Sequence, residues 1–150
     1  MNIETIMDRI IAVDYGTGLR DIITAGKYDW MDDAITSKNF PVQGDGVKKF
    51  RTRIFHFGRY ISSEDTVVAI RKELFLPATH VQGLVYDTMF PDDQRRHPIV
   101  CLGSSAQVHG NRRVVCLDRN GAERYLDLGF WGAGWCGISR FLGVQEVFPA

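Results

Sequence analysis

The sequence predicts one α+β domain in which short helices precede a C-terminal run of antiparallel strands. The chain has 150 residues, a length at which a single hydrophobic core is common. Two segments with helical spacing of apolar residues begin at the N-cap residues Ser62 and Thr79. After Pro98, the apolar runs 99–102 and 114–117 indicate buried strands. Asn120-Gly121 then indicates a hairpin turn, because both residues accept positive φ.

Composition limits the classes of partner. The apolar fraction is 45% and the charged fraction is 24%, as is typical of a globular chain. Eighteen basic residues balance eighteen acidic ones, so the chain has no net field that would gather nucleic acid or anionic lipid. We therefore expect a protein partner, with nucleic acid disfavoured and no membrane.

The N-terminus and the cysteines indicate a cytoplasmic setting. Glu4 and Asp8 interrupt the first apolar residues, so no signal peptide is expected. No window reaches the ~20 apolar residues of a membrane span. The three cysteines, Cys101, Cys116 and Cys136, are odd in number and widely spaced, and we expect them to be reduced and buried.

Residues 1–47 are expected to form an N-terminal helical extension and a connector. Five apolar residues recur at helical spacing and predict a first helix over residues 3–12: Ile3, Ile6, Met7, Ile10 and Ile11. A second helix is expected from Thr17 to Gly26, and residues 27–47 are interpreted as an ordered connector pinned by Trp30 and Phe40. The isoleucines of the first helix would pack on the body or join two chains in a homodimer.

Residues 48–150 are predicted to form the main body. Alternation over residues 48–60 predicts a long strand, and the two capped helices follow it. The second helix carries a T-x-x-Q capping box from Thr79 to Gln82. The inward stripes of the two helices are expected to include Leu74 and Met89. The last strand is predicted from Arg140 to Val147.

Several segments of this body carry a family resemblance. The first strand, the first helix and the start of the second helix of C-type-lectin-like domains are similar to the segment FHFGRYISSEDTVVAIRKELFLPAT. Their central buried strand is similar to PIVCLGS, and their closing strand is similar to SRFLGV. Residues 54–147 therefore resemble this fold, which formylglycine-generating enzymes and phage receptor-binding variable proteins share. PAT, PIVCLGS and RFLGV are also similar to patterns of short uncharacterised bacterial and phage proteins. The resemblance implies two helices packed on a mostly antiparallel sheet.

The sequence departs from the family where the family carries its chemistry. Neither the Glu-Pro-Asn or Gln-Pro-Asp triplet nor the Trp-Asn-Asp triplet of calcium-dependent sugar binding occurs. In the formylglycine-generating branch a redox cysteine pair performs the reaction, and Cys136 alone cannot reproduce that pair. The resemblance thus implies a fold and no particular activity.

The most informative candidate site is the glycine-spaced aromatic stretch at residues 130–136. Phe130, Trp131 and Trp135 either fold back to cap the core or form an exposed platform for a partner, since tryptophan concentrates binding energy at interface centres. In C-type-lectin-like proteins this face often carries the ligand site. A neighbouring loop-to-strand segment would add polar contacts from Asn111, Arg112 and Arg113.

Other chemistry-bearing residues give weaker signals. The four histidines lack metal-ligand spacing, and His80 at a helix start is expected to be exposed. Gly103-Ser104-Ser105 follows a buried strand but lacks the strand-to-helix turn of a nucleophile elbow. The basic runs 48–53 and 95–97 are interpreted as solvated faces. We expect no metal, no cofactor and no catalytic residue.

The leading hypothesis is a non-catalytic protein-binding module, for which the phage-like patterns suggest by analogy a host-interaction role. The first alternative is a divergent enzyme of the formylglycine-generating group, marked by a concave pocket with convergent polar groups. The second is a structural component of a virion or another assembly, marked by obligate oligomerisation through the N-terminal helices.

Overall fold

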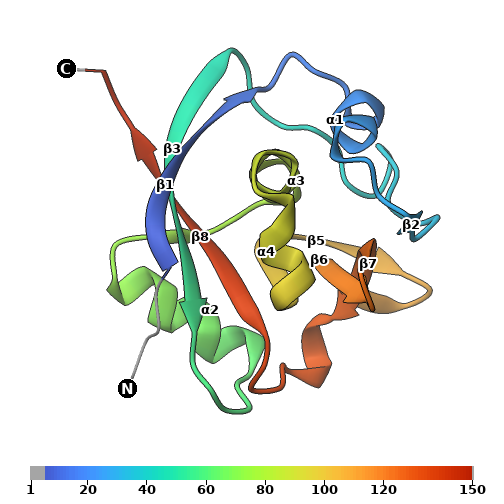
Figure 1. Cartoon of the computed structure of the whole chain (residues 1–150), viewed down its shortest axis with the longest axis vertical. Coiled ribbons are helices and arrows are strands. Elements are labelled where there is room, and N and C mark those ends of the chain that lie inside the picture. Colours follow the sequence, from blue (N-terminus) through green and yellow to red (C-terminus); the bar gives the residue numbers. More distant parts are fainter. Residues whose placement is uncertain (1–5, 150) are drawn as a thin grey trace.

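A single twisted sheet runs through the part of the chain that the computed structural model describes, residues 6–149 (Figure 1). Its main path has the order β1-β3-β8-β5-β6-β7-β2. The strands on this path are β1 Ile6–Asp14, β3 Val47–His56, β8 Arg140–Val147, β5 Ile99–Val108, β6 Asn111–Asn120, β7 Glu123–Phe130 and β2 Trp30–Met31. A short strand off the path, β4 Leu76–Pro77, pairs with β8.

Most neighbours in this sheet are antiparallel. β3 and β8 pair along their length, from Lys49 opposite Val147 to His56 opposite Arg140. The β6–β7 hairpin closes at Gly121, which has φ +61°. Two contacts are parallel, β5 with β8 and β2 with β7. The predicted α+β class is confirmed, and the predicted hairpin and closing strand form where expected.

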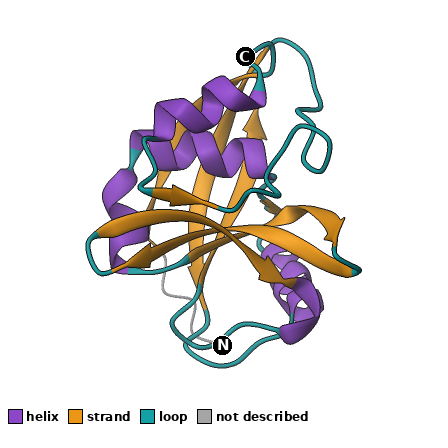
Figure 2. Ribbon diagram, turned by 90° about the vertical axis from the view of Figure 1, so that its right-hand side faces the viewer, coloured by secondary structure: helices purple, strands orange, loops and turns teal. Residues whose placement is uncertain are grey.

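Four α-helices lie on the two faces of the sheet in the described part of the chain: α1 Leu19–Gly26, α2 Ser63–Lys72, α3 His80–Met89 and α4 Pro91–Arg96. Both predicted caps form. Ser62 Oγ accepts from the Asp65 N–H, and Thr79 and Gln82 form a complete capping box. α1 and α3 lie side by side above the crossing strands β5–β7, whereas α2 lies on the opposite side of them (Figure 2).

Each face of the sheet buries its own core. The larger core packs α1 and α3 against alternating residues of the strands, including Ile11, Phe50, Leu117 and Leu142. The second core lies on the opposite face. It contains Ile70 of α2 together with residues of the strands and of the loops beside them, listed here: Phe55, Phe75, Val100, Val114, Trp135 and Phe141. A strand such as β5 contributes to both cores, which explains its continuous apolar start at residues 99–102.

The predicted helix over residues 3–12 is wrong, because residues 6–14 form the edge strand β1 (residues 3–5 lie outside the described part). β1 pairs antiparallel with β3, and Ile11 lies opposite Phe50. Ile11 and Val13 point into the larger core, while Ile10 points outward. Isoleucine spacing in so short a segment fits a helix and a strand alike, and β-branched residues favour the strand once a partner is available.

This strand also corrects the expected division of the chain. Residues 6–47 do not form a helical extension, because β1 and β2 are strands of the same sheet as the rest. Ile11 is buried inside the chain, so the apolar helical face proposed to join two chains does not exist in the described residues. Phe40 is buried in the connector as predicted, and Trp30 packs on Tyr125 while staying half exposed.

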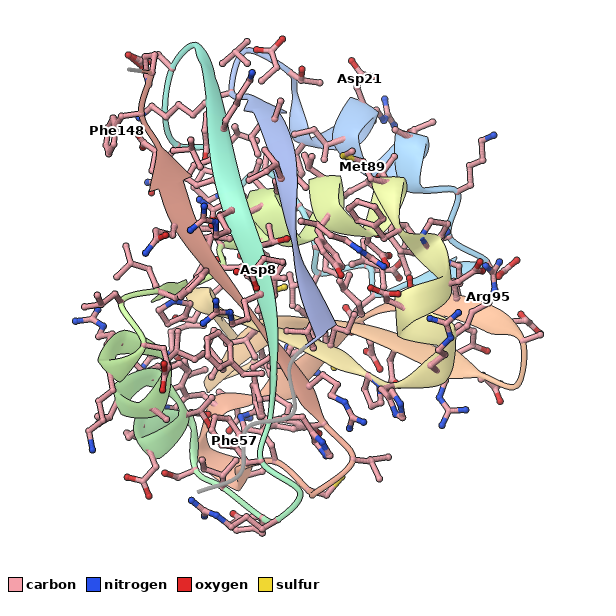
Figure 3. All side chains as sticks on the ribbon, turned by 60° about the vertical axis from the view of Figure 1, so that its left-hand side comes forward. Asp8, Asp21, Phe57, Met89, Arg95 and Phe148 are labelled. Atoms are coloured by element: carbon pink, nitrogen blue, oxygen red, sulfur yellow. The ribbon has the colours of Figure 1, made fainter. Side chains whose placement is uncertain are left out.

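Some expected details of the helices also change. Leu74 has φ +65° after the end of α2 and is 79% exposed, so it is not part of an inward stripe. Met89 is half exposed at the end of α3 (Figure 3). α4, which begins at Pro91, was not predicted. Among the described residues, no helix has the length and apolar character that crossing a membrane would need.

The basic segment 48–53 occupies the start of β3. Lys48, Lys49 and Arg51 are exposed, as a solvated face requires. Arg53 lies farther along the strand and forms an ion pair with Asp8 of β1 at 2.8 Å (Figure 3).

Replacing Ile11 by alanine should lower the free energy of unfolding by about 2–5 kcal/mol, because Ile11 is buried in the larger core. Its neighbour Ile10 is 49% exposed, and Ile10→Ala should cost about 1 kcal/mol or less. Urea unfolding followed by circular dichroism measures both values. Equal losses of free energy in the two variants would contradict the assignment of a strand, because adjacent side chains of a strand point to opposite faces of the sheet.

Candidate functional site

Two arginines stack on two aromatic rings at the end of the β6–β7 hairpin opposite its turn. Arg113 lies across from Phe130 in the strand register, and its guanidinium carbon is 4.1 Å from the Phe130 ring centroid. The guanidinium carbon of Arg112 is 3.6 Å from the ring centroid of Trp131. These four residues, here called the ridge, are all members of the site predicted from the sequence. Asn111, also predicted, is exposed beside them.

Hydrogen bonds hold the ridge in place from three directions. Trp131 Nε1 donates to Glu64 Oε1 of α2 at 2.9 Å. Arg112 Nε donates to Ser105 Oγ of β5 at 3.0 Å, and Arg113 donates to the Leu128 carbonyl oxygen. The side chains therefore lose less conformational entropy when a partner binds than free side chains would.

Trp135, the remaining predicted site residue, caps the second core and does not belong to the exposed surface. It is 8% exposed, stands edge-on to Phe141, and donates from Nε1 to Ser63 Oγ at 2.9 Å. Its ring lies directly on Gly129, where a Cβ atom would come within 2.5 Å of the ring. Of the two alternatives left open by the sequence, core capping therefore applies to Trp135. In the ridge, Phe130 and Arg112 are exposed, whereas Trp131 is half-buried and packs against the edge of the second core.

The backbone between the two tryptophans explains this separation. Residues 131–133 form a single 3₁₀ turn, and Gly134 follows with φ +72°, a conformation that glycine adopts without strain. Tyr60 OH donates to the Ala133 carbonyl at 2.6 Å, and Trp135 exchanges two backbone hydrogen bonds with Ile61. The chain therefore turns inward between Trp131 and Trp135.

Hollows border the ridge on both sides of the Arg112–Trp131 pair. The larger, here called the groove, has a volume of about 570 Å³, and Arg112 and Trp131 form part of its wall. The smaller has a volume of about 390 Å³ and is lined by Asn111, Phe130 and the same stacked pair. Both volumes suit a small molecule or a few side chains of a partner.

Glu64 adds a negative charge at the edge of the ridge. Hydrogen bonds from its own backbone N–H and from Trp131, together with the nearby Arg112, lower the pKa of the Glu64 carboxyl. The carboxylate is therefore ionised at neutral pH and accepts the indole N–H as a charge-assisted hydrogen bond.

His80 is buried against Ser104, which corrects the expectation that it is exposed. It is 4% exposed, its backbone N–H donates to Ser104 Oγ at 2.8 Å, and its Nδ1 lies 2.9 Å from the same oxygen. Burial lowers the pKa of His80, so the ring is neutral at pH 7. No carboxylate of the described residues hydrogen-bonds to either ring nitrogen. The contact therefore ties the start of α3 to β5 and lacks the orienting group of a catalytic triad.

A buried polar cluster that the sequence analysis missed joins α3, α4 and β7. Arg124 donates to Asp87 Oδ2 at 2.8 Å and to Gln94 Oε1 at 2.9 Å, and Tyr28 OH donates to Asp87 Oδ2 at 2.7 Å. Burial raises the pKa of Asp87 to about 6, against the opposing effects of Tyr28 and Arg124. Shifted carboxyls often mark active sites. Neither Asp87 nor Arg124 lines the hollows beside the ridge, so we interpret this cluster as structural.

The cysteines separate into two kinds. Cys101 and Cys116 are buried, as predicted, and burial raises the pKa of Cys101 to about 12 and that of Cys116 above its ordinary value. Both are therefore protonated thiols at neutral pH. Cys136 is exposed, contrary to expectation, because it follows Trp135 on the outer side of the turn.

Comparison of the chain with protein-family models, with curated proteins and with solved structures found no match. Function is therefore inferred from the geometry of the ridge and the hollows beside it.

Trp135→Ala should lower the free energy of unfolding by about 3–5 kcal/mol, because it empties a filled position of the second core. Trp131→Ala should cost less, about 2 kcal/mol, since the half-buried ring loses only part of a core contact, one cation–π contact and one hydrogen bond. Urea unfolding of the two variants measures the difference. A larger loss for Trp131 than for Trp135 would reverse the assignment of core and surface.

The stability of the protein should depend on pH through His80. The unfolded histidine takes up a proton as the pH falls through about 6.5, whereas the buried ring resists protonation. His80 thus stabilises the fold above that pH, and the contribution is lost as the pH falls. Between about pH 7.5 and pH 5, the wild type should lose more free energy of unfolding than His80→Gln, in which other titrating groups are unchanged. Parallel curves for the two proteins would exclude this role.

Proposed function

We propose that this chain is a non-catalytic protein-binding module whose body has a C-type-lectin-like fold. The order of elements supports the fold proposal. The strand β3 is followed by the helices α2 and α3, then by the antiparallel strands β5–β7, and β8 returns to pair with β3. Other elements fall outside that pattern. β1 adds an edge strand beside β3, β2 extends the sheet beyond β7, and α1, β4 and α4 are further additions.

The observation that carries the function is the ridge. Arginine and tryptophan are among the residues that contribute most to binding energy at protein interfaces. Here two arginines are held over two aromatic rings, Trp131 and Phe130, with help from neighbouring hydrogen bonds, and the Phe130 ring is half exposed. Such a preformed surface offers apolar area and directed N–H donors at a low entropic cost.

The side chains that suggest catalysis have structural explanations. The Ser104–His80 contact ties α3 to β5, and the Asp87–Arg124 pair is enclosed between helices and β7. The enzyme alternative is one that has lost or replaced the cysteines of the formylglycine-generating group, and its marks are a concave pocket with convergent polar groups and a strongly shifted titration. The groove is concave, but Asp87, the carboxyl whose pKa burial raises to about 6, does not line it. The alternative of a structural component in a virion or another assembly predicts N-terminal helices that join chains. Residues 6–14 form a strand instead.

The proposal predicts that partner capture depends on the ridge. The tagged full-length chain and its Arg112→Ala/Trp131→Ala variant are cross-linked in lysate of the organism that encodes them, and captured proteins are quantified by mass spectrometry. A partner should be captured by the wild type and reduced at least about tenfold by the variant, since central interface residues contribute about 2 kcal/mol or more each.

Arg119→Ala is the matched control, because Arg119 is an exposed arginine near the turn of the same hairpin. The unfolding midpoint of each variant verifies that it is folded. Equal capture by the wild type and the ridge variant would refute the ridge as the binding surface.

A further inference from the structure

The groove beside the ridge concentrates positive charge in a chain whose net charge is zero. Its lining includes three cationic side chains from three different elements: Lys48 of β3, Arg71 of α2 and Arg112 of β6. One carboxylate, Glu146 of β8, also lines it. Because eighteen basic residues balance eighteen acidic ones in the whole chain, this excess is local.

Apolar side chains form much of the remaining wall. They include Val67 and Leu76, together with Phe50, Leu102 and Val144, which are core residues 5% exposed or less and show only an edge to the groove. Leu76 is 57% exposed in the two-residue strand β4, where its partner in the register is Val144. An apolar group that entered the groove would cover this surface, and burial of apolar area is favourable at about 25 cal/mol per Å².

Two of the cations are positioned by aromatic rings. Arg112 lies on Trp131, and the Lys48 ammonium is 5.9 Å from the ring centroid of Tyr15, which also lines the groove. A ring on one side of a cation leaves its other N–H groups directed toward solvent or a ligand.

The start of α3 also borders the groove, and three of its backbone donors, those of Thr79, His80 and Gln82, are engaged within the chain. The N–H groups of Thr79 and Gln82 are satisfied by the capping box, and the His80 N–H donates to Ser104 Oγ. The Gln82 side-chain amide donates to Tyr15 OH at 3.1 Å. A phosphate group is usually bound by backbone N–H groups at such a helix start. Recognition of an anion in this groove therefore depends on the three cationic side chains.

From these observations we infer that the groove binds a short segment of a partner protein in which acidic side chains alternate with apolar ones. The inference rests on the proposed function, that the chain binds a protein, and names the chemistry of the segment. Carboxylates pair with Lys48, Arg71 and Arg112, and apolar side chains cover Leu76 and its neighbours. The volume of about 570 Å³ accommodates a few side chains.

Peptide selection tests the inference without knowledge of the natural partner. The full chain is presented to a displayed library of random peptides, and the enriched peptides are synthesised and measured by fluorescence anisotropy. Enriched peptides should combine aspartate or glutamate with aliphatic residues, and their affinity should fall as salt is raised. Enrichment of neutral or basic peptides, or of none, would overturn the inference.

Charge reversal then locates the binding. Lys48→Glu/Arg71→Glu should weaken binding of the selected peptide at least about tenfold, because each reversal replaces an attraction by a repulsion. A peptide carrying lysine in place of its acidic residues should regain affinity for this variant. Lys38→Glu/Arg119→Glu is the control, since it makes the same change in net charge at exposed residues outside the groove lining. An equal loss of peptide affinity in the control would show that the effect comes from the change in net charge, and it would refute the groove as the binding site.

Lysate capture separates this inference from the proposed function. If Lys48→Glu/Arg71→Glu still captures the partner that Arg112→Ala/Trp131→Ala loses, the chain is a binding module and the groove is not its acidic-segment site. If both variants lose the partner, both proposals are supported. If neither variant loses the partner, the proposed function fails. The peptide measurements alone then decide whether the groove binds acidic segments.

Discussion

The position of β8 in the middle of the sheet is the constraint on which the rest of the structure depends. This last strand lies between β3, its antiparallel partner, and β5, with which it is parallel at Ile99 and Val100. Without β8, the paired strands β1 and β3 would not belong to the same sheet as the strands β5, β6 and β7. Both cores contain residues of β8, since Leu142 belongs to one and Phe141 to the other. The fold is therefore complete only when the C-terminal strand is in place.

The same constraint produces the ridge. The chain has to travel from the end of β7 at Phe130 to the start of β8 at Arg140, across the face that α2 covers. Along this path Trp135 fills the second core, and Trp131 remains at the rim, where Arg112 covers its ring. The stability of the core and the geometry of the candidate site thus have one structural origin, although separate residues serve each.

Local signals in the sequence predicted the elements that depend on local interactions. The caps at Ser62 and Thr79 fixed the starts of α2 and α3. The hairpin turn lies at Gly121-Ala122, one residue later than the predicted Asn120-Gly121, and its register brings Arg113 opposite Phe130. Four of the six predicted site residues therefore meet as stacked pairs. β1 could not be predicted, because its isoleucine spacing fits either structure and its strand partner begins more than thirty residues later. The burial of His80 and the Asp87–Arg124 pair likewise depend on distant segments, which no local pattern marks.

Composition gives the sum of the charges and does not show where they lie. Three of the ion pairs between arginine and aspartate join residues far apart in the sequence: Arg9 with Asp93, Arg53 with Asp8 and Arg124 with Asp87, each at 2.8 Å. These pairs remove equal numbers of positive and negative charges from those available to a partner. The remaining charges still sum to zero, and their positions decide what a partner meets: Lys48, Arg71 and Arg112 line one groove with a single carboxylate, Glu146. A balanced composition excludes a long-range field, but it leaves room for a local site that recognises acidic side chains at contact distance.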